Sequence, residues 1–447
     1  MRYYLSGILV FAATLFANAF FVSTPAIAQD SEAEEKGRLV RFVEEQISSP
    51  NMQISLNGLA GALSSDVSLS SITIADENGI WLTLTNPRLV WSRSALLRGR
   101  LEVESLTAAE LEVTRTPAAD ESLPDAEASG FSIPELPVAV QVQQLQLDRA
   151  FFGEAVFGLE ATLSLNGRFA LADGNLDTEL AIERLDGPGG SLGLLAKYNA
   201  AEAELETDIT LSEPAGGVLA NLLSIHDQPA IALSISGGGP VEDLQLNLGL
   251  DADNARVLDG RLELDDGFLS SDIGGNFELE GALSTLLAPD QRAFFGDNSR
   301  IAVQFEVPSD GGFVVEQLTL DSGAMSANGR IIRQADGFIS LVDLTANLAL
   351  PDGMPVVLPG QAPSPSLSDA ALTLQFDAAQ SDRWTTQLQV RDLRTQQAIV
   401  PALTLNGGGV VSAADANAGR TVTFDVDASA QGIDAAEAEL QDALGDA

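Results

Sequence analysis

The chain has 447 residues, 45% of them apolar, and carries 64 acidic against 23 basic residues for a net charge of −41. This apolar content is typical of a folded protein. The acidity argues against nucleic acid as a partner and against electrostatic docking on anionic lipid, because both require Lys and Arg clusters. With no Cys and one His, disulfides, thiolate catalysis and Cys-based zinc sites are excluded.

Residues 1–28 have the pattern of an export signal. Arg2 precedes an apolar run from Leu5 to Val22, and the triplet Ala26-Ile27-Ala28 offers a small-x-small cleavage site before a polar stretch. The run also reaches the lower length limit of a membrane-spanning helix. The segment is therefore either a cleaved signal peptide or a retained inner-membrane anchor, and both predict export.

Residues 29–50 form the clearest helix candidate. Leu39, Phe42, Val43 and Ile47 share one face at helical spacing, and Pro50 ends the pattern. This amphipathic helix either caps a sheet or lies on a membrane surface.

From residue 51 onward the hydrophobic period changes to two. Such alternation is typical of antiparallel strands with one buried face. The clearest runs are Met52–Leu56, Ala203–Leu211, Leu244–Leu250, Ile301–Val307, Trp384–Val390 and Val422–Val426. Turns are predicted at Asp173-Gly174, Asp259-Gly260, Asp266-Gly267 and Asp310-Gly311.

Several strands share a finer pattern, with apolar residues at i, i+2, i+5 and i+7. In a regular strand the second pair would face the opposite way, and one extra residue in a β-bulge restores the face. We therefore predict bulged strands. The copies are Val67-Leu69-Ile72-Ile74, Val140-Val142-Leu145-Leu147 and Phe313-Val315-Leu318-Leu320, with a partial copy at Leu101-Val103-Leu106 and a weaker one at Ile339-Leu341-Leu344-Ala346.

Few helices are expected in the body, at Val218–Leu223, Ala282–Phe295 and Asp434–Leu444. Two proline-rich stretches read as loops and divide the body into segments. The predicted division is 51–115, an acidic Pro-rich loop at 116–137, a central segment at 138–350, a second loop at 351–368 and a further strand segment at 369–447.

The helices are too few to cover the apolar faces of so many strands. A Val, Leu or Ile left in water forfeits about 1.5–3 kcal/mol, so something must cover these faces. Either the sheet packs on itself as a dry-cored sandwich, which suits a structural or adhesive protein, or it curls into a groove filled by an apolar ligand. The residues expected to line such a groove are Leu205, Ile209, Leu244, Leu246, Leu248, Ile301, Val303 and Phe305.

No motif supports catalysis, and we predict a protein that is not an enzyme and has no catalytic, cofactor-binding or metal-binding residues. Gly189-Gly190-Ser191-Leu192-Gly193 matches a nucleophile elbow, and His226 follows it, but the parallel α/β context is missing. Asp251-Ala252-Asp253-Asn254 starts like a calcium loop without its Gly and closing Glu, so we interpret it as a turn.

Residues 51–115 resemble the N-terminal region of the TamB/AsmA-like family, in its alphaproteobacterial form. The resemblance rests on Gly58-x-x-Gly61, Asp76-Glu77-Asn78-Gly79-Ile80-Trp81-Leu82 and the block from Trp91 to Leu106. Later stretches similar to that group are Phe131–Val138, Leu185–Gly190 and Leu287–Gly296. Family members are longer, so we expect the chain to correspond to the N-terminal part.

The resemblance implies a long antiparallel, bulged sheet curled into an open hydrophobic groove and anchored at its N-terminus in the inner membrane. It further implies a non-enzymatic, periplasm-spanning scaffold that takes part in outer-membrane protein assembly and phospholipid transport between the two membranes. The implied partners are phospholipid acyl chains and TamA, an outer-membrane barrel of the BamA-like superfamily. In the family, the C-terminal region carries the domain that contacts this barrel.

Overall fold

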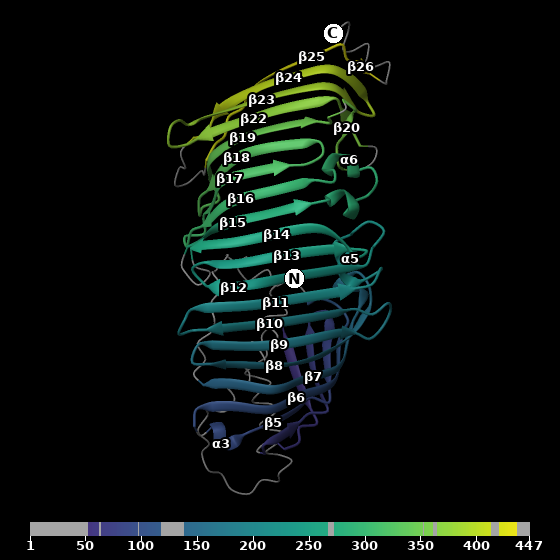
Figure 1. The fold of residues 1–447 in the computed structure, drawn as a ribbon, viewed down its shortest axis with the longest axis vertical. Helices are drawn as coiled ribbons and strands as arrows, with labels where there is room; N and C mark the ends of the chain where they lie inside the picture. Colours follow the sequence, from purple (N-terminus) through teal and green to yellow (C-terminus); the bar gives the residue numbers. More distant parts are fainter. Residues whose placement is uncertain are drawn as a thin grey trace. The chain divides into compact units, whose positions relative to one another are not determined.

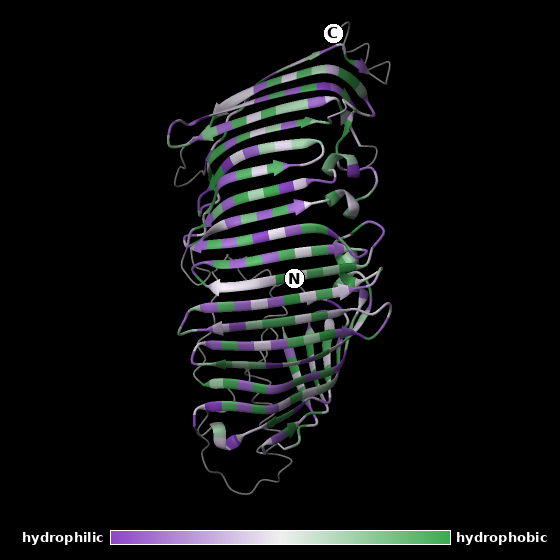
Figure 2. Cartoon of the chain, in the orientation of Figure 1, coloured by the Kyte–Doolittle hydropathy of each residue, from purple (hydrophilic) through white to green (hydrophobic). Residues whose placement is uncertain are grey.

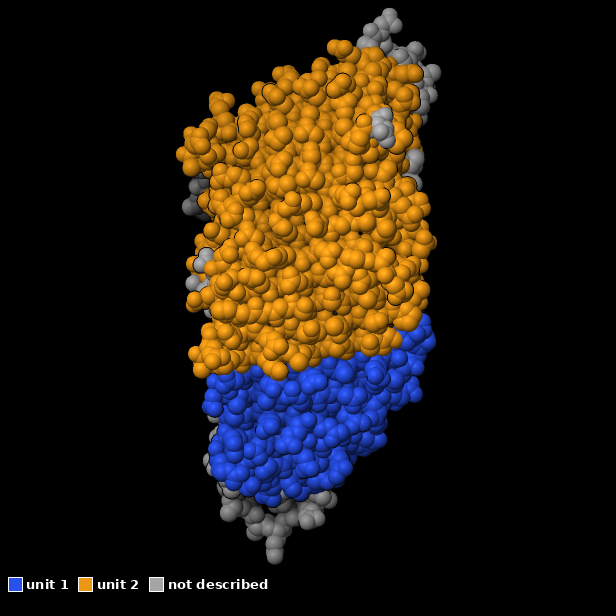
Figure 3. Space-filling view, viewed as in Figure 1, with its two compact units in different colours: residues 1–123, 135–189 blue, residues 124–134, 190–447 orange. Residues whose placement is uncertain are grey.

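Strands make up most of the structure, as the period of two predicted (Figure 1). The computed structural model describes residues 52–61, 64–96, 98–117, 138–266, 272–351, 353–360, 364–412 and 420–435. The predicted signal or anchor at 1–28, the helix at 29–50 and nearly all of the 116–137 loop lie outside these residues. The chain divides between Gly189 and Gly190 into two compact units (Figure 3).

In the part of unit 1 that the structure describes, a sheet is accompanied by two single-turn helices. The helices are α3 (Arg93–Leu96) and α4 (Glu154–Phe157). The strands are β1 (Gln53–Asn57), β2 (Asp66–Ser68), β3 (Ser71–Asp76), β4 (Gly79–Thr85), β5 (Arg88–Trp91), β6 (Arg100–Val113), β7 (Ala139–Phe152), β8 (Ala161–Ala172) and β9 (Asn175–Arg184).

The strands of unit 1 pair antiparallel with one exception. β6 and β7 run parallel, with Leu101 opposite Val140 and Leu106 opposite Leu145. The predicted bulge in β7 is confirmed: the register against β8 shifts between Val142 and Leu145, so both residues stay on one face. The copy at Val67–Ile74 is not a bulged strand, because the chain breaks there into β2 and β3, which pair with different partners.

The two tryptophans of the most distinctive sequence block are core residues of unit 1. Trp81, 9% exposed, packs with Leu82 and Val113, and Trp91, 8% exposed, packs with Leu89 and Val103 in a separate cluster. Their identity is thus accounted for by packing.

The described residues of unit 2 form a long meander of strands with three short helical turns. The turns are α5 (Val218–Leu222), the 3-10 turn η1 (Leu283–Leu286) and α6 (Arg292–Phe295). The strands are β10 (Ser191–Asn199), β11 (Glu204–Glu213), β12 (Ile231–Pro240), β13 (Leu244–Ala252), β14 (Ala255–Asp266), β15 (Ile273–Gly281), β16 (Ser299–Val307), β17 (Phe313–Asp321), β18 (Met325–Arg333), β19 (Ile339–Ala349), β20 (Val356–Val357), β21 (Ser366–Leu367), β22 (Asp369–Asp377), β23 (Arg383–Arg394), β24 (Ala398–Val410), β25 (Asp425–Gln431) and β26 (Asp434–Ala435).

Successive strands of unit 2 pair antiparallel from β10 to β19, and the order continues through β22, β23, β24 and β25. The bulge predicted in β17 is confirmed by a register shift between Val315 and Leu318. The bulge predicted from the weaker copy of the pattern, in β19, is not present. The register of β19 against β22 is regular from Leu341 to Ala349, so Leu341 and Leu344 lie on opposite faces.

The fully buried clusters of unit 2 lie where the helical turns and the β20–β21 hairpin meet the strands. One contains Ile225, Ile231 and Leu286, and the other contains Phe294, Val356 and Leu367. The segment 351–368, predicted as a loop, therefore contributes core: Val356 is 0% and Leu367 is 3% exposed. Apolar side chains between its prolines explain why it packs.

Three further sequence predictions need correction. Ala282–Phe295 is not one helix, because the chain is extended at Leu287, two residues before Pro289, between η1 and α6. The segment predicted as a C-terminal helix starts with the short strand β26, and its remaining residues lie outside the described part of the chain. Asp259-Gly260 is not a turn: both residues lie inside β14.

Candidate functional site: the apolar face of unit 2

A continuous row of apolar residues crosses the unit 2 sheet. The register places Ile209, Ile235 and Leu248 side by side on neighbouring strands. We call this the first row; from β10 to β25 it consists of Leu194, Ile209, Ile235, Leu248, Gly260, Leu279, Ile301, Leu320, Ala327, Ala346, Leu372, Leu388, Leu405 and Ala428.

Gly260 is the one residue of the first row without a side chain. A Cβ there would lie 3.2 Å from Leu248 Cβ and 3.3 Å from the Leu279 side chain. The two leucines thus close over the glycine, and the row stays apolar across β14.

A second row lies two residues further along each strand and on the same face. It includes Leu246, Leu262, Phe277, Val303, Leu318, Leu344 and Leu374 on consecutive paired strands, with Gly329 between Leu318 and Leu344. Thr207 and Gly237 precede this stretch, and Thr386 and Gly407 follow it. Figure 2 shows the resulting apolar and polar blocks alternating along the strands.

All eight residues predicted to line a groove lie on this one face. Ile209, Leu248 and Ile301 belong to the first row, and Leu246 and Val303 to the second. Leu205 is also on this face of β11. Seven of the eight are half-buried and belong to neither buried cluster of unit 2. Leu244 differs: it is 1% exposed and is closed off from solvent.

Sequence reasoning missed several members of the first row, among them Ile235, Leu279 and Leu372. They lie in strands whose alternation is interrupted by Gly, Ala or a bulge, so no single strand reveals the row. Pairing register reveals it, and register is a property of the folded sheet.

Among the described residues of unit 2, the strands of the meander form one layer, and no second sheet lies over the central rows. The two buried clusters lie near α5, η1, α6 and the β20–β21 hairpin. Outside these clusters the strand residues Leu244, Leu264, Val315 and Ala327 are buried as well. Leu246, Leu248, Ile301 and Val303 are partly exposed. The face therefore combines apolar character with access.

The opposite face of β11 to β16 is charged, and its arginines are paired with carboxylates. Arg256 bonds Asp251 at 2.6 Å and Asp259 at 2.7 Å, and these two carboxylates raise the pKa of its guanidinium. Arg300 pairs with Glu278 at 3.2 Å. A shallow hollow of 330 Å³ on this face is lined by such residues together with Asn247. The contrast between the faces is what a half-buried sheet requires.

Aromatic residues gather at the β18–β19 and β22–β23 hairpin ends. Trp384 meets Phe424 edge-on at 5.4 Å between ring centroids, and Phe424 is 72% exposed. Arg420 lies 3.7 Å over the Phe338 ring and bonds Asp336 at 2.7 Å. The hydrogen bond from Arg420 holds the pKa of the Asp336 carboxyl below its ordinary value. This contact fastens residue 420 to a hairpin distant in sequence.

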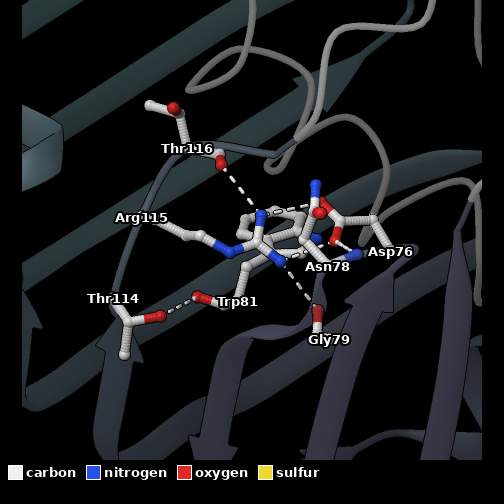
Figure 4. A network of polar contacts seen from close by, with 7 residues as sticks. All are labelled: Asp76, Asn78, Gly79, Trp81, Thr114, Arg115 and Thr116. Carbon is white, nitrogen blue, oxygen red and sulfur yellow. Dashed lines mark hydrogen bonds and ion pairs between the residues drawn. The ribbon is translucent and has the colours of Figure 1, made fainter.

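In unit 1, an arginine clamp fixes the sequence block on which the family resemblance rests (Figure 4). The Arg115 guanidinium donates to both carboxylate oxygens of Asp76, at 2.5 and 2.7 Å, and to the carbonyls of Gly79 and Thr116. Asp76 has a side chain only 5% exposed. The clamp ties the β3–β4 hairpin to the end of β6, which is a structural role.

The residues weighed for chemistry do not converge. Ser191 is the first residue of the antiparallel strand β10, and the Nε2 atom of His226 lies 3.4 Å from Asp227. Asp253 and Asn254 have φ values of 49° and 66°, so the calcium-like string is a hairpin turn, as predicted. Within the described residues, no group of three or more His, Cys, Asp or Glu side chains is placed to hold a metal.

None of the helices in the described part of the chain is long and apolar enough to cross a membrane, and residues 1–28 lie outside that part. No protein-family model matches the chain, and no curated protein and no solved structure matches it either.

Proposed function

We propose that the chain is a non-enzymatic scaffold of the TamB/AsmA-like kind, whose apolar sheet face curls into a groove that carries acyl chains. The observation that carries the proposal is the first row, which runs without a charged or polar side chain from β10 to β25. A protein whose face serves only as a dry core has no need of partial exposure along so many strands.

The chemistry of the face suits an aliphatic cargo. Burial of apolar surface is non-directional, and each methylene removed from water contributes about 0.8 kcal/mol. Rows of Leu, Ile and Val repeat at the strand spacing of about 4.8 Å, so a chain can lie across many strands and slide between equivalent positions. A uniform row has no single deep site, which favours transport over storage.

The resemblance extends this proposal to a cellular setting. On the strength of the resemblance we propose that the chain lies in the periplasm, held to the inner membrane by its N-terminal segment, where phospholipid passes toward the outer membrane and outer-membrane proteins are assembled. TamA is the proposed barrel partner.

Lipid contact is testable at two neighbouring residues of β16. Val303 lies in the second row, and Gln304 is exposed on the other face. We expect a photo-crosslinking residue at 303 to yield phospholipid adducts in cells, and one at 304 to yield none. Mass spectrometry of the purified chain should also detect bound phospholipid. Equal labelling at both positions, with no co-purified lipid, would contradict the proposal and favour the dry-cored alternative.

A further inference from the structure

The apolar face of the unit 1 sheet ends in a single charged side chain. Paired residues cross this face from β6 to β9 in rows, and a row closes with Arg184 after three apolar residues. The rows are Leu101-Val140-Leu171-Leu176, Val103-Val142-Phe169-Thr178, Leu106-Leu145-Gly167-Leu180, Ala108-Leu147-Leu165-Ile182 and Leu111-Ala150-Leu163-Arg184. Within these rows Arg184 is the only residue that carries a charge.

The guanidinium of Arg184 is buried and only partly satisfied. Its side chain is 9% exposed; Nε donates to Asp186 Oδ1 at 3.0 Å, and Nη2 donates to the Glu160 carbonyl at 3.3 Å. Nη1 is buried and has no acceptor among the described residues. Because a buried charged donor without an acceptor is costly, Nη1 is the atom at which an oxygen brought by a ligand gains most.

The loop after β9 places a carboxylate and an uncovered backbone beside this guanidinium. The Asp186 side chain is 37% exposed and accepts the Thr162 N–H at 2.9 Å. Burial raises the pKa of the Asp186 carboxyl, but the hydrogen bonds from Thr162 and Arg184 outweigh burial and hold the pKa below its ordinary value. Gly187 has a φ of 56°, and a Cβ there would lie 3.1 Å from Arg184 Nη2. A buried cation and an accessible anion therefore lie side by side.

The charge balance of this pair favours a ligand that carries both signs. Asp186 already neutralises Arg184, and the chain as a whole has a net charge of −41, so a further lone anion is disfavoured. A phosphate oxygen accepts a charge-assisted hydrogen bond from a guanidinium, and an ammonium group donates one to a carboxylate. A zwitterion of phosphate and ammonium satisfies both partners and adds no net charge.

The neighbouring side chains favour a ligand with aliphatic tails. Leu163, opposite Arg184, and Ile182, in the next row, are half-buried. We propose that Arg184 and Asp186 bind the head group of a zwitterionic phospholipid, with its phosphate on Nη1, its ammonium on the carboxylate and its acyl chains on the rows of unit 1. This inference rests on the proposed function, because it takes phospholipid as the cargo.

Photo-crosslinking next to Arg184 tests the head-group site. The purified full chain carries a photo-reactive residue at 163, or at 303 in the second row of unit 2, and is incubated with phosphatidylethanolamine, phosphatidylglycerol or diacylglycerol in micelles. We expect position 163 to label phosphatidylethanolamine about tenfold more than either other lipid, the difference that one hydrogen bond to a charged group makes. Position 303 should label the three lipids alike.

Two substitutions separate binding from a structural role. We expect Arg184→Gln to lower phosphatidylethanolamine labelling at 163 about tenfold and to leave 303 unchanged. Arg168→Gln is the matched control, because Arg168 lies on the opposite face of β8 and pairs with Asp177 and Glu179. Asp186→Asn keeps an acceptor for the Thr162 N–H and should shift the preference at 163 toward phosphatidylglycerol. An ion pair that only stabilises the fold would leave this preference unchanged.

Several results would overturn the inference. Diacylglycerol that labels 163 as well as phosphatidylethanolamine does, or labelling at 303 with none at 163, would remove the head-group site and leave the proposed function standing. Labelling at neither position would contradict the proposed function as well. Full displacement of the lipid by glycerophosphoethanolamine, which has the head group and no acyl chain, would assign the site to a soluble phosphate ester. Thermal unfolding by circular dichroism verifies the fold of each variant.

Discussion

Replacing Leu248 by Asp tests the apolar face at its centre. Leu248 lies in the first row between Ile235 and Gly260 and is half-buried. Asn247, its neighbour in β13, is exposed on the opposite face. Asn247→Asp therefore introduces the same charge one residue away without touching the apolar row.

The size of the effect follows from the row. A charged side chain would keep about three methylenes of a bound acyl chain from their contacts, at about 0.8 kcal/mol each. The loss of about 2.4 kcal/mol corresponds to about fifty-fold weaker binding. A half-buried Leu contributes about 1–2 kcal/mol to folding, which a domain with about 5–15 kcal/mol of stability tolerates. Leu248→Asp should thus fold and bind more weakly.

Displacement of a fluorescent fatty acid measures the affinity, and urea unfolding measures the stability of both variants. We expect Leu248→Asp to bind about fifty-fold more weakly, and Asn247→Asp to bind as the native chain does. Equal affinities for two folded variants would refute the idea that this row carries apolar chains.

Three structural contacts give further predictions. Glu213, 7% exposed, accepts the N–H groups of Leu219 and Ala220 at the start of α5, so Glu213→Ala should cost about 2 kcal/mol in urea unfolding; an unchanged midpoint would contradict this. Asp76→Asn should lower the melting temperature by weakening the clamp with Arg115, more than a change at the exposed Glu77 does. Because the Asp336 pKa is depressed in the folded chain, its stabilising effect is full at neutral pH and is lost as the pH falls through that depressed value; Asp336→Asn should remove this part of the acid dependence of melting.

The positions of the strands, and which side chains share one face of a strand, could be predicted because both depend on neighbours in the sequence. The alternation around Leu246 and Val303 fixes which side chains share a face, and the odd step in Val140–Leu147 required the bulge that β7 contains. The same reasoning failed for Ile339–Ala346, where Val342 continues the alternation and Leu341 lies on the other face.

Other features could not be predicted because they depend on partners distant in sequence. Asp259-Gly260 has the composition of a turn, yet Leu248 and Leu279 on neighbouring strands make Gly260 a strand residue. Leu244 resembles Leu246 in sequence, and only the folded surroundings distinguish a closed position from an accessible one. The parallel pairing of β6 with β7 likewise leaves no signal in either strand.

Because the chain has no native cysteine, single cysteines can be placed along the first row and labelled with a polarity-sensitive dye. Ile209, Ile235, Leu248 and Ile301 are the positions to label, with Asp208 and Asn247 on the other face as controls. We expect phospholipid to shift the emission to shorter wavelength at every row position and at neither control. Dyes in the row that report a dry environment before lipid is added, and do not respond to it, would show that the face is a closed core.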